Sequence, residues 1–439
     1  MTQRTQGSPG SLVSPTAAAL LAVGIAHGDL LHPPVTVSTA PGSFSTISIV
    51  DIDGDTDLDI VSADVNAVRV LHNDGAGAFT EAVAIPIGAT IRDLDVADMD
   101  ADGDIDIIVG DHLNRISVAS NDGLGVFAVS SFDVAGSTHL YAVHAHDANQ
   151  DGIPDIIVGR FDGNSARSVA IYRNFGASGF QVRGVYTVLG SITDIDTALI
   201  SGDARPDIVV TTDMGVYILR SLGSGSFAAP LLYPTVDPQS VAAADIDADG
   251  DTDLAVPGDT DHFPSLGMYI LRNNAGVNLA PPVRYPIAGI SASGIALGRL
   301  DAGLSVDAVI VSGDTGSSVL SVMSNDGAAA FTMIEQHALG TGAPTDCALG
   351  DLDRDADLDV VVSTSSSVAV LFNSRRTPRP RCPADINNSG TVDASDFVIL
   401  AANFGASVTP GDPGDLNNDG LVNAADFTIF AAAFGATCP

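Results

Sequence analysis

Short apolar runs alternate with polar turns over most of the chain. Segments such as VRVLHNDGAGAF at 68–79 and VYILRSLGSGSF at 216–227 have Val, Ile or Leu at alternating positions and end in a Gly-containing turn and an aromatic residue. Alternation of β-branched residues, bounded by turn residues, is typical of short antiparallel strands. The pattern therefore predicts an all-β domain built from many short strands.

An acidic loop recurs between these apolar runs. Its first copy, DIDGDTDLDIV at 51–61, returns in similar form at 98, 147, 245 and 351, and two less similar copies begin at 199 and 299. The seven starts span 300 residues in six intervals, a mean period of 50. A period near 50 with room for four strands is typical of a β-propeller rather than a helical solenoid. Seven copies predict seven blades.

The two ends of this repeat region are incomplete units. The tail of a unit precedes the first loop, as PGSFSTISIV at 41–50, while the last copy stops at VAVLFNS, 368–374. We expect the N-terminal segment to complete the seventh blade, because closing the ring removes the free edges that an open sheet exposes.

Five copies of the loop carry the oxygen ligands of a hard cation. Carboxylate or amide side chains stand at positions 1, 3, 5 and 9, and the backbone carbonyl of position 7 can complete the shell. Calcium takes six to eight oxygens in flexible geometry, whereas magnesium demands a stricter octahedron. Asp and Gly also form turns without metal, but five copies in register favour Ca²⁺, about five ions in the propeller. The predicted ligands are Asp51, Asp53, Asp55, Asp59, Asp98, Asp100, Asp102, Asp106, Asp147, Asn149, Asp151, Asp155, Asp245, Asp247, Asp249, Asp253, Asp351, Asp353, Asp355 and Asp359.

The remaining two copies have lost most of these ligands. Two or fewer carboxylates surround a divalent ion poorly, so we predict that both loops bind no metal. Position 9 is nevertheless Asp in all seven copies, which predicts that its carboxylate also holds the turn by hydrogen bonds. The two reduced sets are Leu199, Ser201, Asp203 and Asp207, and Arg299, Asp301, Gly303 and Asp307.

These loops and turns such as NFGASGF resemble FG-GAP or VCBS repeats, the propellers of the integrin α-chain head and of many bacterial surface proteins. The resemblance covers residues 36–374, and we assign 27–374 to the propeller. It implies calcium loops on one face, between the first two strands of each blade. It also implies a partner-binding site on the opposite face in those members that bind partners.

The strand before each loop has an apolar column with polar neighbours. Cys347 stands in the apolar column among aliphatic residues, which predicts a buried, reduced thiol. If these strands are the innermost, the polar positions gather near the axis, away from the calcium loops. They could bind sugar hydroxyls or a cation, and the alternative is that they line a watery channel. This possible ligand face comprises Asp93, Asp95, His144, Asp194, Asp196 and Asp346.

The charge of the chain excludes some partners. The formal net charge is −36, and all 18 basic residues are Arg. Such acidity disfavours nucleic acid, which is bound through Lys and Arg contacts to phosphate. The apolar run at 17–26 predicts a signal peptide over 1–26, with a disordered tail as the alternative. No segment is long enough to span a bilayer. The signal peptide, together with a disulfide expected in the C-terminal module, predicts an extracellular or cell-surface location.

A small second module follows a Pro/Arg-rich linker at 375–384. Two near-copies 30 residues apart, DINNSGTVDASDFVILAANF and DLNNDGLVNAADFTIFAAAF, each read as a 12-position calcium loop running into a short helix. We assign 385–439 to this module and expect two Ca²⁺ ions, a core between the two phenylalanine-rich helix faces (Phe397, Leu400 and Phe404; Phe427, Phe430 and Phe434), and a Cys382–Cys438 disulfide. The predicted ligands are Asp385, Asn387, Ser389, Asp393, Asp396, Asp415, Asn417, Asp419, Asn423 and Asp426, with the carbonyls of Thr391 and Leu421.

These two loops resemble a dockerin type I domain, the module that binds cohesins in cellulosomes. The resemblance implies a cohesin-like partner. Ends of this kind bracketed by Cys-Pro also resemble those on large secreted proteins of planctomycete-type bacteria, which implies attachment to a cell surface as the alternative.

The sequence predicts a non-catalytic binding or adhesion protein with an unidentified protein or glycan ligand. The alternative is a polysaccharide lyase or glycoside hydrolase, for which base and charge-stabilising residues would be needed. Candidates for those roles are scattered (Arg92, Tyr141, His144 and Arg160), and the chain has no Lys and no Trp. A structural surface-layer component is the second alternative.

Overall fold

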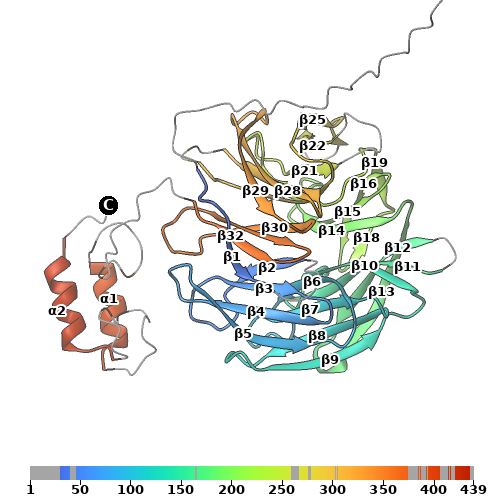
Figure 1. The fold of residues 1–439 in the computed structure, drawn as a ribbon. Coiled ribbons are helices and arrows are strands. Elements are labelled where there is room, and N and C mark those ends of the chain that lie inside the picture. The colour runs from blue at the N-terminus through green and yellow to red at the C-terminus, as the bar shows by residue number, and fades with distance from the viewer. Residues whose placement is uncertain are drawn as a thin grey trace, which may run out of the picture.

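Seven four-stranded antiparallel sheets are arranged around a central axis in the computed structural model (Figure 1). The structure describes residues 30–39, 46–163, 166–258, 266–274, 278–301, 303 and 305–373 of this region, and 384, 386, 392, 394–405, 414, 416 and 421–435 beyond it. Each sheet is one blade, so the predicted all-β, seven-bladed propeller is confirmed.

Consecutive strands form most of the blades. The first three are β2 (Ile47–Val50), β3 (Asp59–Ala63), β4 (Ala67–Asn73) and β5 (Phe79–Pro86); β6 (Ile91–Ala97), β7 (Asp106–Asp111), β8 (Arg115–Asn121) and β9 (Phe127–Asp133); β10 (His139–His146), β11 (Asp155–Phe161), β12 (Arg167–Asn174) and β13 (Phe180–Val188), with the short 3₁₀ helix η1 (Gly176–Ser178) before β13.

The next three blades follow the same order, and two of them carry an extra small hairpin. They are β14 (Ile192–Ala198), β15 (Asp207–Thr212), β16 (Gly215–Leu219) and β19 (Leu231–Tyr233), with hairpin β17 (Ser221–Gly223) and β18 (Ser226–Phe227); β20 (Ala242–Ala244), β21 (Asp253–Gly258), β22 (Gly267–Leu271) and β25 (Val283–Pro286), with hairpin β23 (Asn273–Asn274) and β24 (Asn278–Leu279); and β26 (Ala292–Gly298), β27 (Asp307–Asp314), β28 (Ser317–Asn325) and β29 (Phe331–Gly340).

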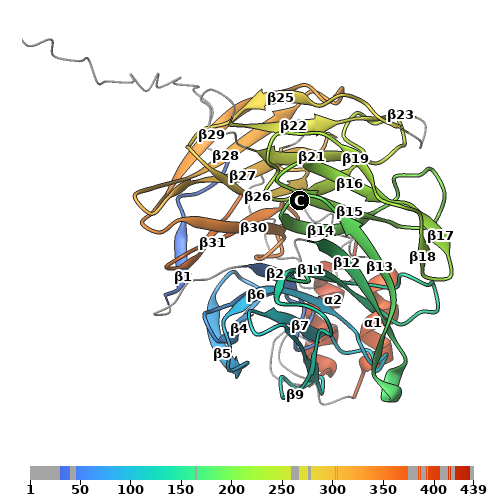
Figure 2. The ribbon, with the colours of Figure 1, turned by 90° about the vertical axis from the view of Figure 1, so that its right-hand side faces the viewer.

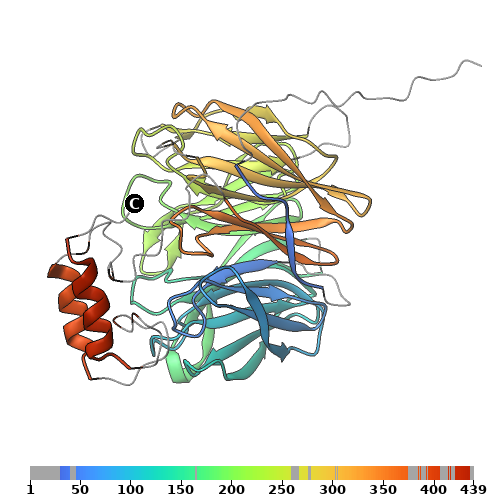
Figure 3. The same cartoon turned by 60° about the vertical axis from the view of Figure 1, so that its left-hand side comes forward.

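The seventh blade joins the two ends of the repeat region. It contains β30 (Pro344–Gly350), β31 (Asp359–Thr364), β32 (Val368–Leu371) and, as its outer strand, β1 (Val35–Ser38), which pairs Val35 with Val370. The predicted closure by the N-terminal segment is therefore confirmed (Figure 3). The closing strand lies upstream of the expected one, because Ile47–Val50 forms the inner strand of the first blade.

The core of the propeller lies between neighbouring blades. The second strand of every blade is almost entirely buried, as in β3 and β7, whereas outer strands such as β9 alternate exposed and half-buried residues. First strands of neighbouring blades contact one another, for example β6 with β10 and β26 with β30, so they are the innermost strands. Apolar clusters join adjacent blades, which explains why the second strands read as continuous apolar runs.

The C-terminal module has two helices, α1 (Ala394–Asn403) and α2 (Ala424–Ala433), which lie side by side (Figure 2). The buried core of the module includes Leu400 from α1 and Phe430 from α2. The expected burial of all six phenylalanine-rich positions is wrong, because Phe404 and Phe434 are 54% and 57% exposed. Each helix has only ten residues and therefore covers little of the apolar face of the other. No helix in the described part of the chain has the length and apolar character needed to cross a bilayer.

Candidate metal loops and the axial carboxylates

The acidic loops connect the first and second strands of each blade. In the second loop, Asp98 accepts hydrogen bonds from the backbone N–H groups of Asp102 (3.2 Å) and Gly103 (3.1 Å). Asp147, Asp245 and Asp351 make the equivalent pairs in their loops. The first carboxylate of each loop thus closes the turn on itself, as short polar side chains do in Asx turns.

These tight loops hold several non-glycine residues in the left-handed region. Position 4 has positive φ in six loops, occupied by Gly54 (78°), Ala101 (62°), Gln150 (62°), Gly202 (74°), Ala248 (60°) and Arg354 (59°). A residue with a Cβ pays a steric cost in this region, so the surrounding contacts must compensate. The loops are therefore constrained, and the constraint turns alternate side chains toward one point.

Four loops bring three acidic side chains together. In each of them, one carboxylate oxygen per residue lies within 4.8 Å of the others. Three facing carboxylates repel one another unless a cation lies between them, and hard oxygen donors in a flexible loop suit calcium. The donor set fits the ion, although the ligand roles of individual residues remain predictions. The four triplets are Asp51, Asp53 and Asp55; Asp98, Asp100 and Asp106; Asp245, Asp247 and Asp253; and Asp351, Asp353 and Asp355.

The raised pKa values of the buried aspartates and a buried oxygen without a hydrogen-bond partner also support a cation in these loops. Burial, reinforced by neighbouring carboxylates, raises the pKa of Asp59 and Asp359 to about 7 and that of Asp106 and Asp253 to about 6. Oδ1 of Asp247 is buried without a hydrogen-bond partner. A buried, unpaired acceptor costs free energy, and a cation bound in the loop would remove that cost.

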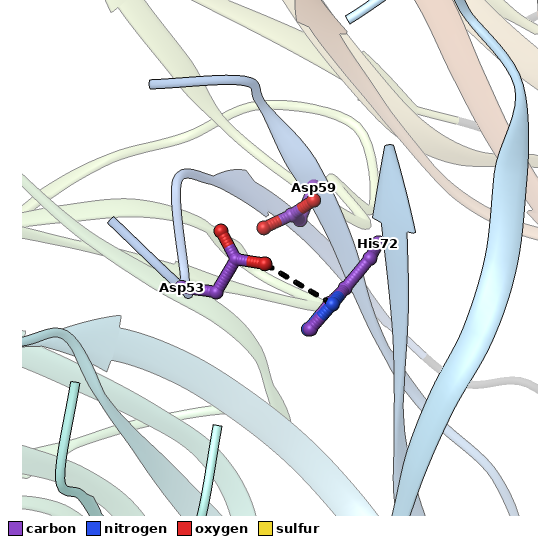
Figure 4. Close-up of side chains that lie close together, drawn as sticks. All are labelled: Asp53, Asp59 and His72. Carbon is purple, nitrogen blue, oxygen red and sulfur yellow. Dashed lines mark ion pairs between the residues drawn. The ribbon is translucent and has the colours of Figure 1, made fainter. Parts of the chain in front are cut away.

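The first loop also contains an imidazole that the sequence analysis did not include. His72 on β4 places Nδ1 3.1 Å from Oδ2 of Asp53, and Asp53, Asp59 and His72 form a further group of facing donors (Figure 4). The side chain precedes Asn73, the first residue of the NDG turn. That position could have drawn attention to it, since Arg173, Arg272 and Ser324 at the equivalent position also contact their loops.

The third loop differs from the four acidic ones. Its position 3 is Asn149, whose Oδ1 accepts a hydrogen bond from Nη2 of Arg173 at 3.0 Å, and the same nitrogen lies 2.9 Å from Oδ2 of Asp151. The amide of Asn149 donates to Asp155 (2.9 Å). Within the described residues this loop gathers no acidic triplet, and calcium binding by Asp147, Asn149, Asp151 and Asp155 remains a prediction.

The two reduced loops are stabilised by other contacts. Asp203 of the fourth loop pairs with Arg205, and Asp207 accepts from the hydroxyl of Ser201 (3.2 Å). In the sixth loop, Ser324 donates to Asp301 at 3.3 Å. No acidic triplet occurs in the described part of either loop, and the absence of metal from both loops stays a prediction.

The buried aspartate at position 9 stabilises the loop in every blade. Its aspartate is at most 1% exposed in all seven copies. In the second blade, Oδ2 of Asp106 accepts from the N–H of Met99 at position 2 and Oδ1 accepts from the N–H of Asn121 on the third strand, both at 2.8 Å. A bond from the residue equivalent to Asn121 recurs in every blade, with Ser221 as that residue in the fourth. The prediction that this aspartate holds the turn is confirmed.

An asparagine at or just beyond the end of the third strand links six of the seven blades to the preceding one, and sequence reasoning missed it. The side-chain amide of Asn121 donates to the carbonyl of Ile52 in the preceding blade (2.7 Å) and to Ile105 in its own loop (3.2 Å). Ser221 takes this place in the fourth blade. The signal was available, because the asparagine opens the NDG, NFG and NNA turns. The six asparagines are Asn73, Asn121, Asn174, Asn273, Asn325 and Asn373.

At the opposite end of the inner strands, three aspartates each bind the next blade. Asp93 accepts from the N–H of Val143 (2.9 Å), Asp194 from Val241 (3.0 Å) and Asp346 from Ile47 (3.2 Å). The hydroxyls of Ser240 and Thr46 add bonds to Asp194 and Asp346. Burial raises the pKa of Asp93 well above its ordinary value, that of Asp194 to about 7 and that of Asp346 to about 6. These carboxylates are structural links between blades.

His144 forms a charged pair beside them. Its Nδ1 lies 3.0 Å from Oδ2 of Asp95, and Nε2 lies 3.1 Å from the hydroxyl of Thr197. Burial lowers the pKa of His144, but the hydrogen bond to Asp95 and the charges of Asp95, Asp196 and Asp194 outweigh it and raise the pKa to about 9. The imidazole therefore carries a positive charge at neutral pH and balances the aspartates, which disfavours a role as general base.

The remaining sequence candidates lie apart from the loops. Cys347 is a free thiol, 5% exposed among aliphatic side chains, and burial raises its pKa well above the ordinary value. Tyr141 packs against the core shared by the third and fourth blades. Arg160 donates to the carbonyl of Ala135 (2.6 Å) and to Ser168 (3.2 Å), and Arg92 is exposed.

In the C-terminal module, the last predicted ligand of each loop is buried. Asp396 and Asp426 are fully buried, and Asp426 accepts from the N–H groups of Leu416 and Asn423, both at 2.8 Å. Asn423 caps α2 in return by accepting from Ala425. The signal peptide over 1–26, most of the 375–384 linker, the Cys382–Cys438 pair and the predicted ligands Asp385, Asn387, Ser389, Asp393, Asp415, Asn417 and Asp419 lie outside the described residues.

Comparison with known families matches both parts of the chain. An FG-GAP-like repeat model matches residues 51–109, 98–158 and 200–256, and a dockerin type I domain model matches residues 383–434. No curated protein matches the sequence.

Two of the similar solved structures share the fold of this chain. Crystal structures of BBS1N in complex with ARL6DN, soaked with lead or with mercury, align with TM-scores of 0.55 and 0.54 at 13% identity, covering 79% of this chain and 98% and 97% of theirs. The structure of an Agrocybe aegerita lectin, described as recognising non-reducing terminal N-acetylglucosamine, aligns with a TM-score of 0.47 at 19% identity over 68% of this chain and 81% of its own. At such identities the similarity concerns the fold alone.

Proposed function

The chain is a seven-bladed FG-GAP β-propeller with a C-terminal dockerin type I domain, and from this premise we propose that it is a secreted, calcium-binding, non-catalytic binding or adhesion module held on a partner by its dockerin domain. A dockerin domain implies a cohesin-type partner. The propeller would then be the part that is presented to a protein or glycan ligand.

The observation that carries this proposal is the apolar surface of the two dockerin helices. Val398 is 65% exposed, and Phe397 and Phe427, which contact each other across the helix pair, are 42% and 43% exposed. Phe404 and Phe434 add two more exposed rings. A small domain gains stability by burying such side chains, and a grouped apolar surface is typical of a protein-binding site.

The calcium part of the proposal rests on the four acidic triplets and the buried position-9 aspartates. Each triplet concentrates negative charge in a constrained loop, so binding of a cation to the folded state alone would stabilise that state. The axial carboxylates do not demand a cation in the same way, because backbone N–H groups and His144 already satisfy them.

Docking can be tested by binding the intact protein to an immobilised type I cohesin in calcium. We expect saturable binding that is lost in excess chelator and weakened at least tenfold by Val398→Asp, which places a charge in the apolar surface. Val185→Asp is the matched control, since Val185 is an exposed valine (49%) on propeller strand β13. Equal binding by wild type and Val398→Asp would overturn this role for the helices.

The non-catalytic role can be tested with a glycan array followed by product analysis. We expect a bound glycan to remain intact after prolonged incubation with the calcium form. Release of shortened or unsaturated products would replace the binding proposal with the lyase or hydrolase alternative, because only bond cleavage generates them.

A further inference from the structure

One residue at or just beyond the end of the third strand occupies an equivalent position in each blade. It immediately precedes the asparagine that links the blades, or Ser221 in the fourth blade, so we call this position the pre-asparagine column: His72, Ser120, Arg173, Arg220, Arg272, Ser324 and Phe372. In the blades where a contact is present, the partner is the position-3 side chain of the loop. His72 meets Asp53 (3.1 Å), Arg173 meets Asn149 (3.0 Å), Arg272 meets Asp247 (3.7 Å) and Ser324 meets Asp301 (3.3 Å).

The column divides the predicted calcium loops by charge. The third and fifth loops face a guanidinium, Arg173 or Arg272, whereas the second and seventh face the uncharged Ser120 or Phe372. Arg173 is the more deeply engaged of the two, because it also contacts Asp151 at 2.9 Å. Phe372 lies beside Asp353 of the seventh loop and fills the space next to Gly77 of the first blade, where an added Cβ would lie 2.5 Å from the ring.

A fixed positive charge beside a divalent-ion loop has two consequences. It neutralises part of the negative charge that attracts the ion, and it repels the ion directly over a few ångströms. It also engages an oxygen of the position-3 side chain, which must be released or shared when a cation binds. Both effects lower affinity, and neither operates in a loop that faces serine or phenylalanine.

We propose that the pre-asparagine residue sets the calcium affinity of each loop, so that the second and seventh loops fill at lower calcium concentrations than the third and fifth. This inference rests on the calcium-binding function proposed above. Arg173 and Arg272 act here as affinity-setting residues and not as ligands. The propeller would therefore stiffen in steps as calcium rises, with the blades that carry Arg173 and Arg272 responding last.

The test is a reciprocal exchange between the second and third blades. Calcium binding to the intact, decalcified protein is measured by competition with a chromophoric chelator for wild type, Arg173→Ser and Ser120→Arg. We expect Arg173→Ser to raise the affinity of one site about tenfold and Ser120→Arg to lower that of one site about tenfold. Arg272→Ser should reproduce the gain in the fifth blade, so the inference remains testable if one exchange impairs folding.

Arg92→Ser is the matched control. Arg92 is exposed near the start of β6, at the end of the inner strand away from the acidic loops. It should leave calcium affinity unchanged. Unchanged or lower affinity in both Arg173→Ser and Arg272→Ser would overturn the inference while leaving calcium binding intact. Absence of calcium binding by folded wild type would overturn the proposed calcium-binding function itself.

Discussion

The two ends of the inner strands use the same residue, aspartate, in different ways. At the loop end, carboxylates face one another in groups of three, and the chain supplies few cations to separate them. At the axial end, Asp93, Asp194 and Asp346 each face a backbone N–H of the next blade, and Asp95 faces His144. We propose that one end is completed by an ion from solution, whereas the other is completed by the fold. Clustered aspartates thus indicate a metal only where their partners are one another.

Removing calcium should lower the stability of the protein more than any other change predicted from this comparison. We expect excess chelator to lower the melting temperature of the protein by roughly 10 °C or more, because several sites each contribute about 2–3 kcal/mol when well saturated. Differential scanning calorimetry with calcium and with chelator measures this. Magnesium added back is the control, and it should restore little of the loss. An unchanged melting temperature would contradict the role assigned to the loop end.

The second largest loss of stability should come from removing an asparagine side chain that links two blades. Asn121→Ala should destabilise the protein by about 1–3 kcal/mol, because the carbonyls of Ile52 and Ile105 lose a buried donor. Urea unfolding in saturating calcium measures the change. Ser221→Ala in the fourth blade is the natural comparison and should cost less than about 1 kcal/mol, since the serine replaces the amide there. Equal losses would show that the amide does not join the blades energetically.

At the axial end, the carboxylates should make the free energy of unfolding depend on pH even when calcium is saturating. The folded pKa of Asp194, about 7, lies above the ordinary 3.8, so its contribution to stability is present below about pH 4 and is lost as pH rises through 7. Asp194→Asn retains an acceptor for Val241 but cannot ionise. It should reduce the fall in unfolding free energy between pH 4 and pH 8 by about 1–2 kcal/mol, measured in saturating calcium.

The control for this pH experiment is Asp133→Asn, which alters an exposed aspartate at the end of β9. Its pH profile should follow that of wild type. A profile for Asp194→Asn that also follows wild type would mean that burial at the axis does not favour the protonated carboxyl.

The smallest effect is expected beside Asp346, at Cys347. Its thiol packs among Val309, Val362 and other aliphatic residues, so Cys347→Val should change the unfolding free energy by less than about 1.5 kcal/mol. The wild-type thiol should react with a thiol reagent only after denaturation. Fast labelling of the native protein would show that this part of the inner strand is open to solvent.

The features that sequence could predict are those in which neighbours along the chain act together. A loop of nine residues forms from its own aspartates, so spacing alone revealed the loops, their period and the number of blades. Position 9 could be assigned because Asp59 bonds to Ile52, only seven residues away. The metal triplets follow from the same local geometry.

The features that escaped prediction depend on contacts between distant segments. Asn73 reaches the carbonyl of Leu352, 279 residues away, and that contact exists only after the ring has closed. His72 and Arg173 approach their loops from another strand, so spacing within the loop could not reveal them. In the C-terminal module, helical periodicity identified the apolar faces but not how little of each face the partner helix covers.

Because β1 pairs with β32, the seventh blade can form only after almost all of the propeller has been synthesised. Strand Val35–Ser38 is made early but must wait for Val368–Leu371 before its own ladder can form, whereas each of the other six blades is continuous in sequence. Closing so long a loop carries a large entropic cost and slows folding. Until β1 pairs with β32, the repeat region therefore has an open strand edge at each end. This last pairing is the step at which a chaperone that shields strand edges would protect the chain most.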